Sequence, residues 1–575
     1  MRPSHSPFPR TDDYDSRRSS ARRRSGSPPS APGGAWRWIA EHPLAFGLVL
    51  ALIAALPTEI PQISPILRAF ILQGLIVALF VLLAAVGPYR EHLGRAALRG
   101  PLPWLLALLA WSVGSVLFPP ARAFGVADLL RPYAIAELLR LLFCAGVFFG
   151  AAYGLRTGSL RPLVFSVLLL GAAIALYGFV QFSATPNLGA EVTSLFSSHE
   201  PFGSYLMLML PVALALALDR DGDQKVMLGA QAIAVVLAAA LLLARTRSAW
   251  VGEGLALLTL ALLAWRYTAV RLNKTNKALI VGPLLILSLG LAMLVFSSQL
   301  APLLSQRVST FHHVIKDDSF GSRLRFWRAA CRMTSERPVF GWGLGTFPII
   351  QQRWSGQGGD PEQAITQGTS YWENAHNFWV QWSAETGAVG LFLYVGAVAA
   401  FLLSAICVLP TMRPGFPRTL LIGCLAATVG ACGDMAGAPS YVDAGVSVLP
   451  WFWMGLGLAA CREGRRESAS AGDAPALPPT PLWVWVGAGI VGLIAAAAVL
   501  LVGVRQPHTQ PPEIVLNRVK ILLTKPANQG IVYQLAFPAS EPLRAGGAEC
   551  LILHRHLDVV TTGAVPLTRM NGEAT

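Results

Sequence analysis

Two arginines, Arg245 and Arg247, stand in the segment "ARTRSAW" between two long apolar stretches of the sequence. A guanidinium group stays charged at every physiological pH and presents a planar fork of donors that fits phosphate oxygens. Charges retained in so short a hinge need a reason, and an anionic ligand supplies one. The hinge therefore indicates a site that binds an anion.

A second basic element is the segment 322–337, "SRLRFWRAACRMTSER", which has the periodicity of an amphipathic helix. Leu324, Trp327 and Cys331 recur on one side, and three arginines recur on another: Arg325, Arg328 and Arg332. Pro338 is expected to end the helix, and "GWGLG" to form a flexible turn after it. Two roles fit this composition: a helix that lies on anionic lipid headgroups, or one that holds a phosphorylated lipid substrate.

The third feature is His376, which lies just before an apolar stretch and is flanked by Glu373, Asn374 and Asn377. Histidine titrates near neutral pH, so its side chain can accept a proton in a reaction. A single histidine beside tryptophan also fits a structural role as an anchor at a membrane surface. The residues alone leave both roles open.

The composition indicates what must position these side chains. The chain has 575 residues, of which 54% are hydrophobic and 13% are charged, and its mean hydropathy is +0.52. Soluble proteins carry about 25% charged residues, so a soluble enzyme, a disordered chain and a secreted disulfide scaffold are all excluded. The net charge of +14 lies mostly in short segments between apolar runs, which favours membrane lipids, and no nucleic acid, as partners.

The fold class predicted from these runs is an all-α polytopic integral membrane protein with about 12–13 transmembrane helices. Each candidate span is close to the ~20 residues that cross the hydrocarbon. The candidates are 38–56, 66–87, 102–118, 134–154, 162–182, 202–218, 226–244, 248–265, 278–298, 386–409, 418–437, 444–461 and 482–504.

The charges of the loops orient these spans. Loops 57–65, 183–201 and 438–443 contain no Lys or Arg, whereas the alternate loops are basic, so the positive-inside rule places the N-terminus in the cytoplasm. The predicted organisation is a disordered tail at 1–35, nine helices at 36–298, a long extracytoplasmic loop at 299–376, three helices at 377–461, a linker at 462–481, a last helix at 482–504 and a small extracytoplasmic tail at 505–575. The hinge with Arg245 and Arg247 then faces outside, against the charge rule.

Charged residues inside the predicted spans are few. Glu137 and Arg140 lie three residues apart and can pair on one helix face. Glu253 and Asp434 lie near the ends of their spans. Charges in a membrane are functional candidates, although local pairing or snorkelling to the interface explains them equally well.

Four segments together resemble the O-antigen ligase and polymerase superfamily of bacterial envelope glycosyltransferases. They are "SSHEPFGSYLMLMLP", "TRSAW", "GSRLRFWRAA…ERPVFGWGLGTF" and "AHNFWVQWSAETGAVGL", in this order and with the long loop before the last. The resemblance covers roughly residues 160–460. The thirteenth span and the outside tail depart from the common twelve-span ligase.

The resemblance implies a lipid-dependent glycosyltransferase in the bacterial inner membrane, with its active site on the periplasmic side. The donor would be a glycan on undecaprenyl pyrophosphate, and the acceptor lipid A–core, another glycan or a protein hydroxyl. The resemblance carries over Arg247 and Arg323 as pyrophosphate-binding residues and His376 as the catalytic residue. Arg245 is a further candidate for substrate binding. Glu385 could orient His376, bind sugar hydroxyls or simply mark the start of a helix.

Three functions remain in view: an O-antigen ligase, a polysaccharide polymerase or protein O-oligosaccharyltransferase with the same chemistry, and a flippase of lipid-linked glycans. A flippase should line a path with charges along several spans, whereas this chain concentrates its arginines and His376 at one membrane face. We identify no acidic or histidine cluster with metal-ligand spacing among these features. The sequence therefore predicts no metal and no cofactor, with arginines in place of a divalent cation.

Overall fold

The computed structural model describes residues 42–56, 100–117, 127–155, 158–184, 191–219, 224–267, 318–347, 351, 354, 374–470 and 481–505, together with short strands between residues 520 and 574. In the described part, nine helices are long and apolar enough to span a membrane. They are α7 (Ala127–Phe149, continued as a π-turn over Gly150–Gly154), α8 (Leu160–Ala184), α9 (His199–Ala217), α10 (Gln224–Ala244), α11 (Arg247–Tyr267), α18 (Phe378–Val408), α19 (Phe416–Asp434), α20 (Ala444–Ser470) and α21 (Leu482–Val504).

Two shorter apolar helices, α2 (Pro43–Ala55) and α6 (Leu102–Leu117), occupy two further predicted spans. The predicted spans 66–87 and 278–298, and the tail at 1–35, lie outside the described residues. The described membrane part of the protein is therefore all-α and polytopic, as the hydropathy predicts.

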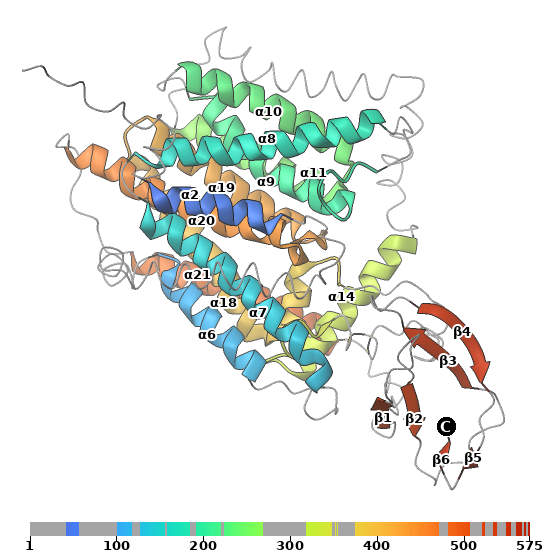
Figure 1. The fold of residues 1–575 in the computed structure, drawn as a ribbon. Helices are drawn as coiled ribbons and strands as arrows, with labels where there is room; N and C mark the ends of the chain where they lie inside the picture. The colour runs from blue at the N-terminus through green and yellow to red at the C-terminus, as the bar shows by residue number, and fades with distance from the viewer. Residues whose placement is uncertain are drawn as a thin grey trace, which may run out of the picture. The chain divides into compact units, whose positions relative to one another are not determined.

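The most enclosed helices are α9, α19 and α20, which pack against one another, while α10 and α11 flank α9 (Figure 1). Small residues allow the closest approach. A Cβ added to Gly252 of α11 would lie 2.8 Å from the carbonyl oxygen of Gly430 in α19. Membrane helices commonly associate through such small-residue contacts. Large apolar side chains stay exposed on the outer helices, for example Leu169 of α8 and Ile494 of α21, which suits a lipid-facing surface.

Arginines meet aromatic rings and carbonyl groups at one end of this bundle, which we call the basic end. There Arg418, near the start of α19, donates to the carbonyl oxygen of Tyr267 at the end of α11. The Arg161 guanidinium lies 5.1 Å from the ring centre of Phe416, and Arg462 lies over Tyr153. The opposite end, which we call the histidine end, carries the beginnings of α9, α11 and α18.

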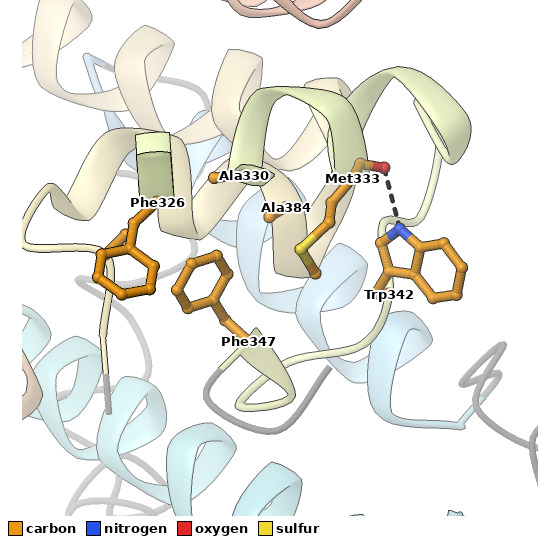
Figure 2. Packing of buried hydrophobic residues seen from close by; sticks show 7 residues of the cluster. Phe326, Ala330, Met333, Trp342, Phe347 and Ala384 are labelled. Atoms are coloured by element: carbon orange, nitrogen blue, oxygen red, sulfur yellow. Dashed lines mark hydrogen bonds between the residues drawn. The ribbon is translucent and has the colours of Figure 1, made fainter. Parts of the chain in front are cut away.

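The predicted basic helix is present as α14 (Asp318–Glu336), and it packs against α18 and α21 at the histidine end. Figure 2 shows its buried face, where Phe326, Ala330 and Met333 meet Trp342 and Phe347 from the turn that follows. The indole nitrogen of Trp342 donates to the Met333 carbonyl, 2.9 Å away.

The predicted faces of α14 need one correction. Arg325 and Arg328 are exposed, but Arg332 is buried and pairs with Glu336, with 3.4 Å between nitrogen and oxygen. The reason is that α14 is packed on two sides. A second cluster joins Cys331 to Val499 of α21, so an arginine close to both contacts cannot remain in solvent.

The turn "GWGLG" was expected to be flexible, and this expectation is wrong. Helix α18 breaks at Gly387, whose φ of 77° is in the left-handed region that glycine tolerates. The carbonyl of Ala384, freed by the break, accepts a hydrogen bond from Trp342 N–H at 2.9 Å. Ala388 N–H donates to the carbonyl of Pro338 at 2.8 Å. Backbone hydrogen bonds thus dock the turn onto the kink.

Helix α18 also begins at Phe378, before the predicted span.

Short connections complete the helical part: 3₁₀ turns at Leu409–Thr411 and Ser440–Val442. The tail forms three antiparallel strand pairs, β1 (Lys520–Leu523) with β2 (Tyr533–Ala536), β3 (Ala548–Leu553) with β4 (Val559–Val565), and β5 (Arg569–Met570) with β6 (Glu573–Ala574).

Candidate active site

His376 lies in a tight turn of residues 374–377, which we call the histidine turn. Its φ of 49° is in the left-handed region, which costs a non-glycine residue free energy and persists only where neighbours enforce it. Asn374 enforces it from one side, because its side-chain oxygen accepts the His376 N–H at 3.0 Å. Asn377 acts from the other side and caps α18, accepting from Trp379 N–H at 3.0 Å and from Val380 N–H. The local sequence "NAHN" therefore fixes the turn.

Three helices hold the histidine turn in place. Ala375 N–H donates to the side-chain oxygen of Gln381 in α18, at 2.9 Å. The Ala375 carbonyl accepts from the indole of Trp327 in α14, at 3.0 Å. Phe378 N–H donates to the carbonyl of Met435, just beyond α19, at 2.8 Å. A side chain at this point is positioned by contacts from α14, α18 and the end of α19.

Arg323 comes close to this turn from α14. One guanidinium nitrogen is 3.5 Å from the carboxylate of Glu200 in the first turn of α9, and another is 3.5 Å from the carbonyl oxygen of Gly437. Its positive charge also acts on His376. The structure thus brings together Arg323 and His376, two of the residues that the resemblance implied.

The hinge between α10 and α11 belongs to the same cluster. Arg245 adopts a left-handed φ of 53°, and the next residue, Thr246, is buried and donates to the carbonyl of His199 at 2.8 Å. Arg247 begins α11, and its charge lies close enough to interact with that of Glu200. The hinge is therefore tied to the start of α9, and Glu200 lies between the charges of Arg247 and Arg323.

The environment of His376 sets its protonation state. Burial, and secondarily the Arg323 guanidinium, lower the pKa of His376 from 6.5 to about 4. Both causes disfavour the charged imidazolium. The imidazole is therefore neutral at pH 7 and keeps a lone pair that can accept a proton.

Glu385 does not mark the start of a helix, because α18 begins seven residues earlier, at Phe378. One carboxylate oxygen accepts Gly345 N–H at 2.9 Å, and the other accepts Phe347 N–H and the side-chain amide of Gln381, both at 3.3 Å. The carboxylate is buried, and these bonds attach it to the "GWGLG" turn and to Phe347 just after it. It connects to the histidine turn through Gln381, which also binds Ala375.

A small pocket that opens to solvent borders His376. Glu137 and Arg140 of α7 line it and form the ion pair predicted from their spacing. Arg140 also donates to the carbonyl of Tyr441 at 2.7 Å. The pocket is completed by residues of α18 and of the connection after α19: Asn377, Phe378, Gln381, Trp382, Glu385, Ala438, Pro439 and Tyr441.

Sequence reasoning missed two residues of this site. Glu200 is one, although "SSHEP" carries a signal: a serine at the helix N-cap position followed by an acid in the first turn. Gln381 is the other, and its spacing of four residues from Glu385 puts both on one helix face. Their partners, Arg323 and Ala375, are remote or lie across a helix start, so sequence spacing alone does not reveal them.

The prediction that the chain has no acidic cluster with metal-ligand spacing needs a correction. Asp-x-Asp spacing does occur, at Asp219, Asp221 and Asp223. Asp219 lies just after the end of α9, whereas Glu200 lies in the first turn of the same helix. Asp219 therefore lies at the basic end, away from His376. Residues 220–223 lie outside the described part of the chain.

Comparison with known proteins tests the resemblance independently of these contacts. No curated protein matches the chain. The family model described as O-antigen ligase matches residues 232–395, a range that runs from α10 through the hinge, α14 and the histidine turn into α18. It contains Arg245, Arg247, Arg323, His376 and Glu385, whereas Glu200 and the Glu137–Arg140 pair lie outside it. Residues 232–395 of this chain are therefore similar to the O-antigen ligase family, in the region that holds the hinge, α14 and the histidine turn.

Proposed function

We propose that this protein is a membrane glycosyltransferase that moves a glycan from undecaprenyl pyrophosphate to an acceptor hydroxyl, in the manner of an O-antigen ligase with lipid A–core as acceptor. Its place would be the bacterial inner membrane, with the histidine end on the periplasmic side. The family match supports a ligase- or polymerase-like glycosyltransferase. The donor, the acceptor and the membrane face are the proposed part.

The observation that carries the proposal is that two arginines act on Glu200 and that one of them, Arg323, also lies beside a neutral histidine. Arg247 starts α11 and Arg323 lies in α14, yet both act on Glu200, and Arg323 also acts on His376. A pyrophosphate leaving group develops negative charge as its bond to the sugar breaks. Positive charge fixed in advance at that point is commonly the largest contribution to catalysis.

In the proposed reaction, the acceptor hydroxyl oxygen bonds to the anomeric carbon of the donor glycan. The bond between that carbon and the pyrophosphate oxygen breaks, and its electron pair leaves with undecaprenyl pyrophosphate. The hydroxyl proton passes to the imidazole of His376 and from there to water. Arg247 and Arg323 would hold the pyrophosphate, and Glu200 would keep both guanidinium groups in place before the donor arrives.

Glu385 would act at one remove from the chemistry. Its carboxylate fixes the docked turn and, through Gln381, the backbone of the histidine turn. We therefore propose a positioning role for Glu385. Arg245 would assist electrostatically from the hinge. In this scheme arginines replace a divalent cation, so transfer should survive a chelator, and restoration by magnesium or manganese after chelation would refute that part.

The test is transfer by purified protein in lipid vesicles that contain an undecaprenyl-pyrophosphate-linked oligosaccharide. Three acceptors are compared: lipid A–core, a free oligosaccharide of the same repeat, and a carrier protein. Glycan on lipid A–core supports the ligase, glycan on the other two supports a polymerase or a protein glycosyltransferase, and movement of the donor across the bilayer without transfer would support a flippase. Absence of transfer to all three overturns the proposed activity.

Orientation is tested separately with reporter fusions at residues 270 and 340. The proposal expects a cytoplasmic signal at 270 and a periplasmic signal at 340. A cytoplasmic signal at 340 would place α14 on the cytoplasmic face of the membrane and would refute the proposed location.

A further inference from the structure

The pocket beside His376 has a lining that includes neither Arg323 nor Arg247. Arg323 contacts the carbonyl of Gly437, whereas the next residues, Ala438 and Pro439, line the pocket. His376 borders the pocket and also interacts electrostatically with Arg323. A molecule in the pocket would thus meet His376 next to whatever group the arginines hold.

The charges of the two subsites differ. Glu137 and Arg140 pair within the pocket, so their charges offset each other. Glu385 adds a second carboxylate to the lining. A phosphate in this pocket would meet two carboxylates, which disfavours it. The arginine cluster, by contrast, directs two positive charges at one carboxylate.

The lining of the pocket suits sugar hydroxyls. The Glu137 side chain is 26% exposed and that of Arg140 is 13% exposed, and the Arg140 guanidinium donates to the carbonyl of Tyr441. A carboxylate oxygen accepts from several donors at once, and a guanidinium donates to several acceptors. Phe378, Trp382 and Tyr441 add aromatic surface beside these polar groups.

We propose that this pocket binds the terminal sugar of the acceptor, with Glu137 accepting hydrogen bonds from its hydroxyls and Arg140 fixing Glu137. The inference rests on the proposed transferase function and extends it, because it places the acceptor on the α7 side of His376 and the donor pyrophosphate on the α14 side. Glu137 and Arg140 lie outside residues 232–395, so acceptor choice would reside in a part of the chain separate from the donor site.

The experiment measures the dependence of the transfer rate on donor and on acceptor separately, with the acceptor that the parental protein uses. Absence of transfer by the parental protein refutes the proposed function and is thereby distinguished from failure of this inference. With an active parent, Glu137→Gln should raise the acceptor KM at least about tenfold, since loss of a hydrogen bond to a charged group costs about 1.5–3 kcal/mol. The donor KM should stay within about twofold.

Two further variants keep the test decisive. Phe378→Leu removes aromatic surface and leaves the ion pair intact, and it should raise the acceptor KM while the donor KM stays constant. Arg325→Gln, on the exposed side of α14, is the control and should change neither constant. Parental donor binding by each variant shows that it is folded. A rise in donor KM alone would mean that the pocket holds the donor sugar, and unchanged constants in both pocket variants would mean that it holds no substrate; either result overturns the inference.

Discussion

Arginines gather at both ends of the helical bundle, but the two ends give them different partners. At the basic end, Arg418 donates to backbone carbonyls of Tyr267 and Met412, and Arg161 lies over an aromatic ring. At the histidine end, Arg323 faces a carboxylate at 3.5 Å and lies beside a neutral imidazole. At the basic end, arginine thus binds the ends of helices to one another. At the histidine end, it places positive charge beside a proton acceptor.

This difference teaches that the partner, more than the charge, separates a structural arginine from a candidate substrate ligand. A carbonyl group or a ring bound to arginine fixes two helices together. A carboxylate between two arginines keeps positive charge concentrated in one place, where an incoming anion can use it. The following changes test the contrast, from the largest expected effect to the smallest.

The largest effect is expected at His376. His376→Ala should reduce transfer by about 10²–10⁴-fold, the usual contribution of a general base, while donor binding stays close to parental. Transfer and donor binding are measured on equally expressed protein. Transfer by His376→Ala at the parental rate would show that the histidine is structural and that the proposed mechanism is wrong.

The arginines at the histidine end should come next. Arg323→Lys and Arg247→Lys keep the charge but lose the planar fork, and we expect transfer to fall on the order of 10²-fold, as it does when one stabilising donor is removed from a catalytic site. Arg325→Lys, on the exposed side of α14, is the matched control and should be nearly silent. Equal losses in Arg323→Lys and Arg325→Lys would contradict the distinction drawn between these two positions.

A smaller effect should come from the packing of α14. A Cβ added to Gly503 of α21 would lie 2.2 Å from the carbonyl oxygen of Cys331, so Gly503→Leu must shift α14 and with it Arg323. Small misplacements of catalytic groups are costly, and we expect about a tenfold loss of transfer. Gly254→Leu is the control, since an added Cβ there meets nothing within 4 Å. Parental activity in Gly503→Leu would show that α21 does not position α14.

The pH dependence should be a subtler signature. His376 must be neutral to accept a proton, and its pKa is lowered from 6.5 to about 4. We therefore expect kcat/KM to stay constant as the pH falls through 6.5 and to decline only as the pH approaches the lowered pKa of about 4. Because the Arg323 guanidinium contributes to the lowering, Arg323→Ala should move the decline toward higher pH. A parental decline centred at 6.5, or no movement in Arg323→Ala, would contradict this account of the environment of His376.

The smallest effect on transfer should be at the basic end. Arg418→Lys removes part of the bonding between α19 and the end of α11, so the protein should lose about 1 kcal/mol of stability. Thermal unfolding in detergent measures that loss. The transfer rate per folded molecule should remain parental, and a loss comparable to that of Arg323→Lys would erase the difference between the two ends.

The sequence predicted a large part of this arrangement. Apolar runs of span length determine helices in any membrane protein, because the backbone must satisfy its hydrogen bonds within each segment. Motif order pointed to Arg247, Arg323 and His376, and the spacing of Glu137 and Arg140 predicted their ion pair. Periodicity also placed Arg325 and Arg328 on the open side of α14, but it gave that helix one apolar face, whereas two are packed and Arg332 is buried between them.

What the sequence determined by itself is the apolar helices of the described part of the chain and the residue types available at their ends. Only the tertiary structure decided that Arg247 and Arg323 both act on Glu200. It also decided that the "GWGLG" turn binds the carbonyl groups that the break in α18 leaves free. The contact of Gln381 with both Glu385 and the histidine turn is the third such feature. These contacts link elements far apart in the chain or reverse a local preference, as the left-handed φ of His376 does. Local patterns report the interactions of near neighbours, and contacts between distant helices exist only once the bundle has packed.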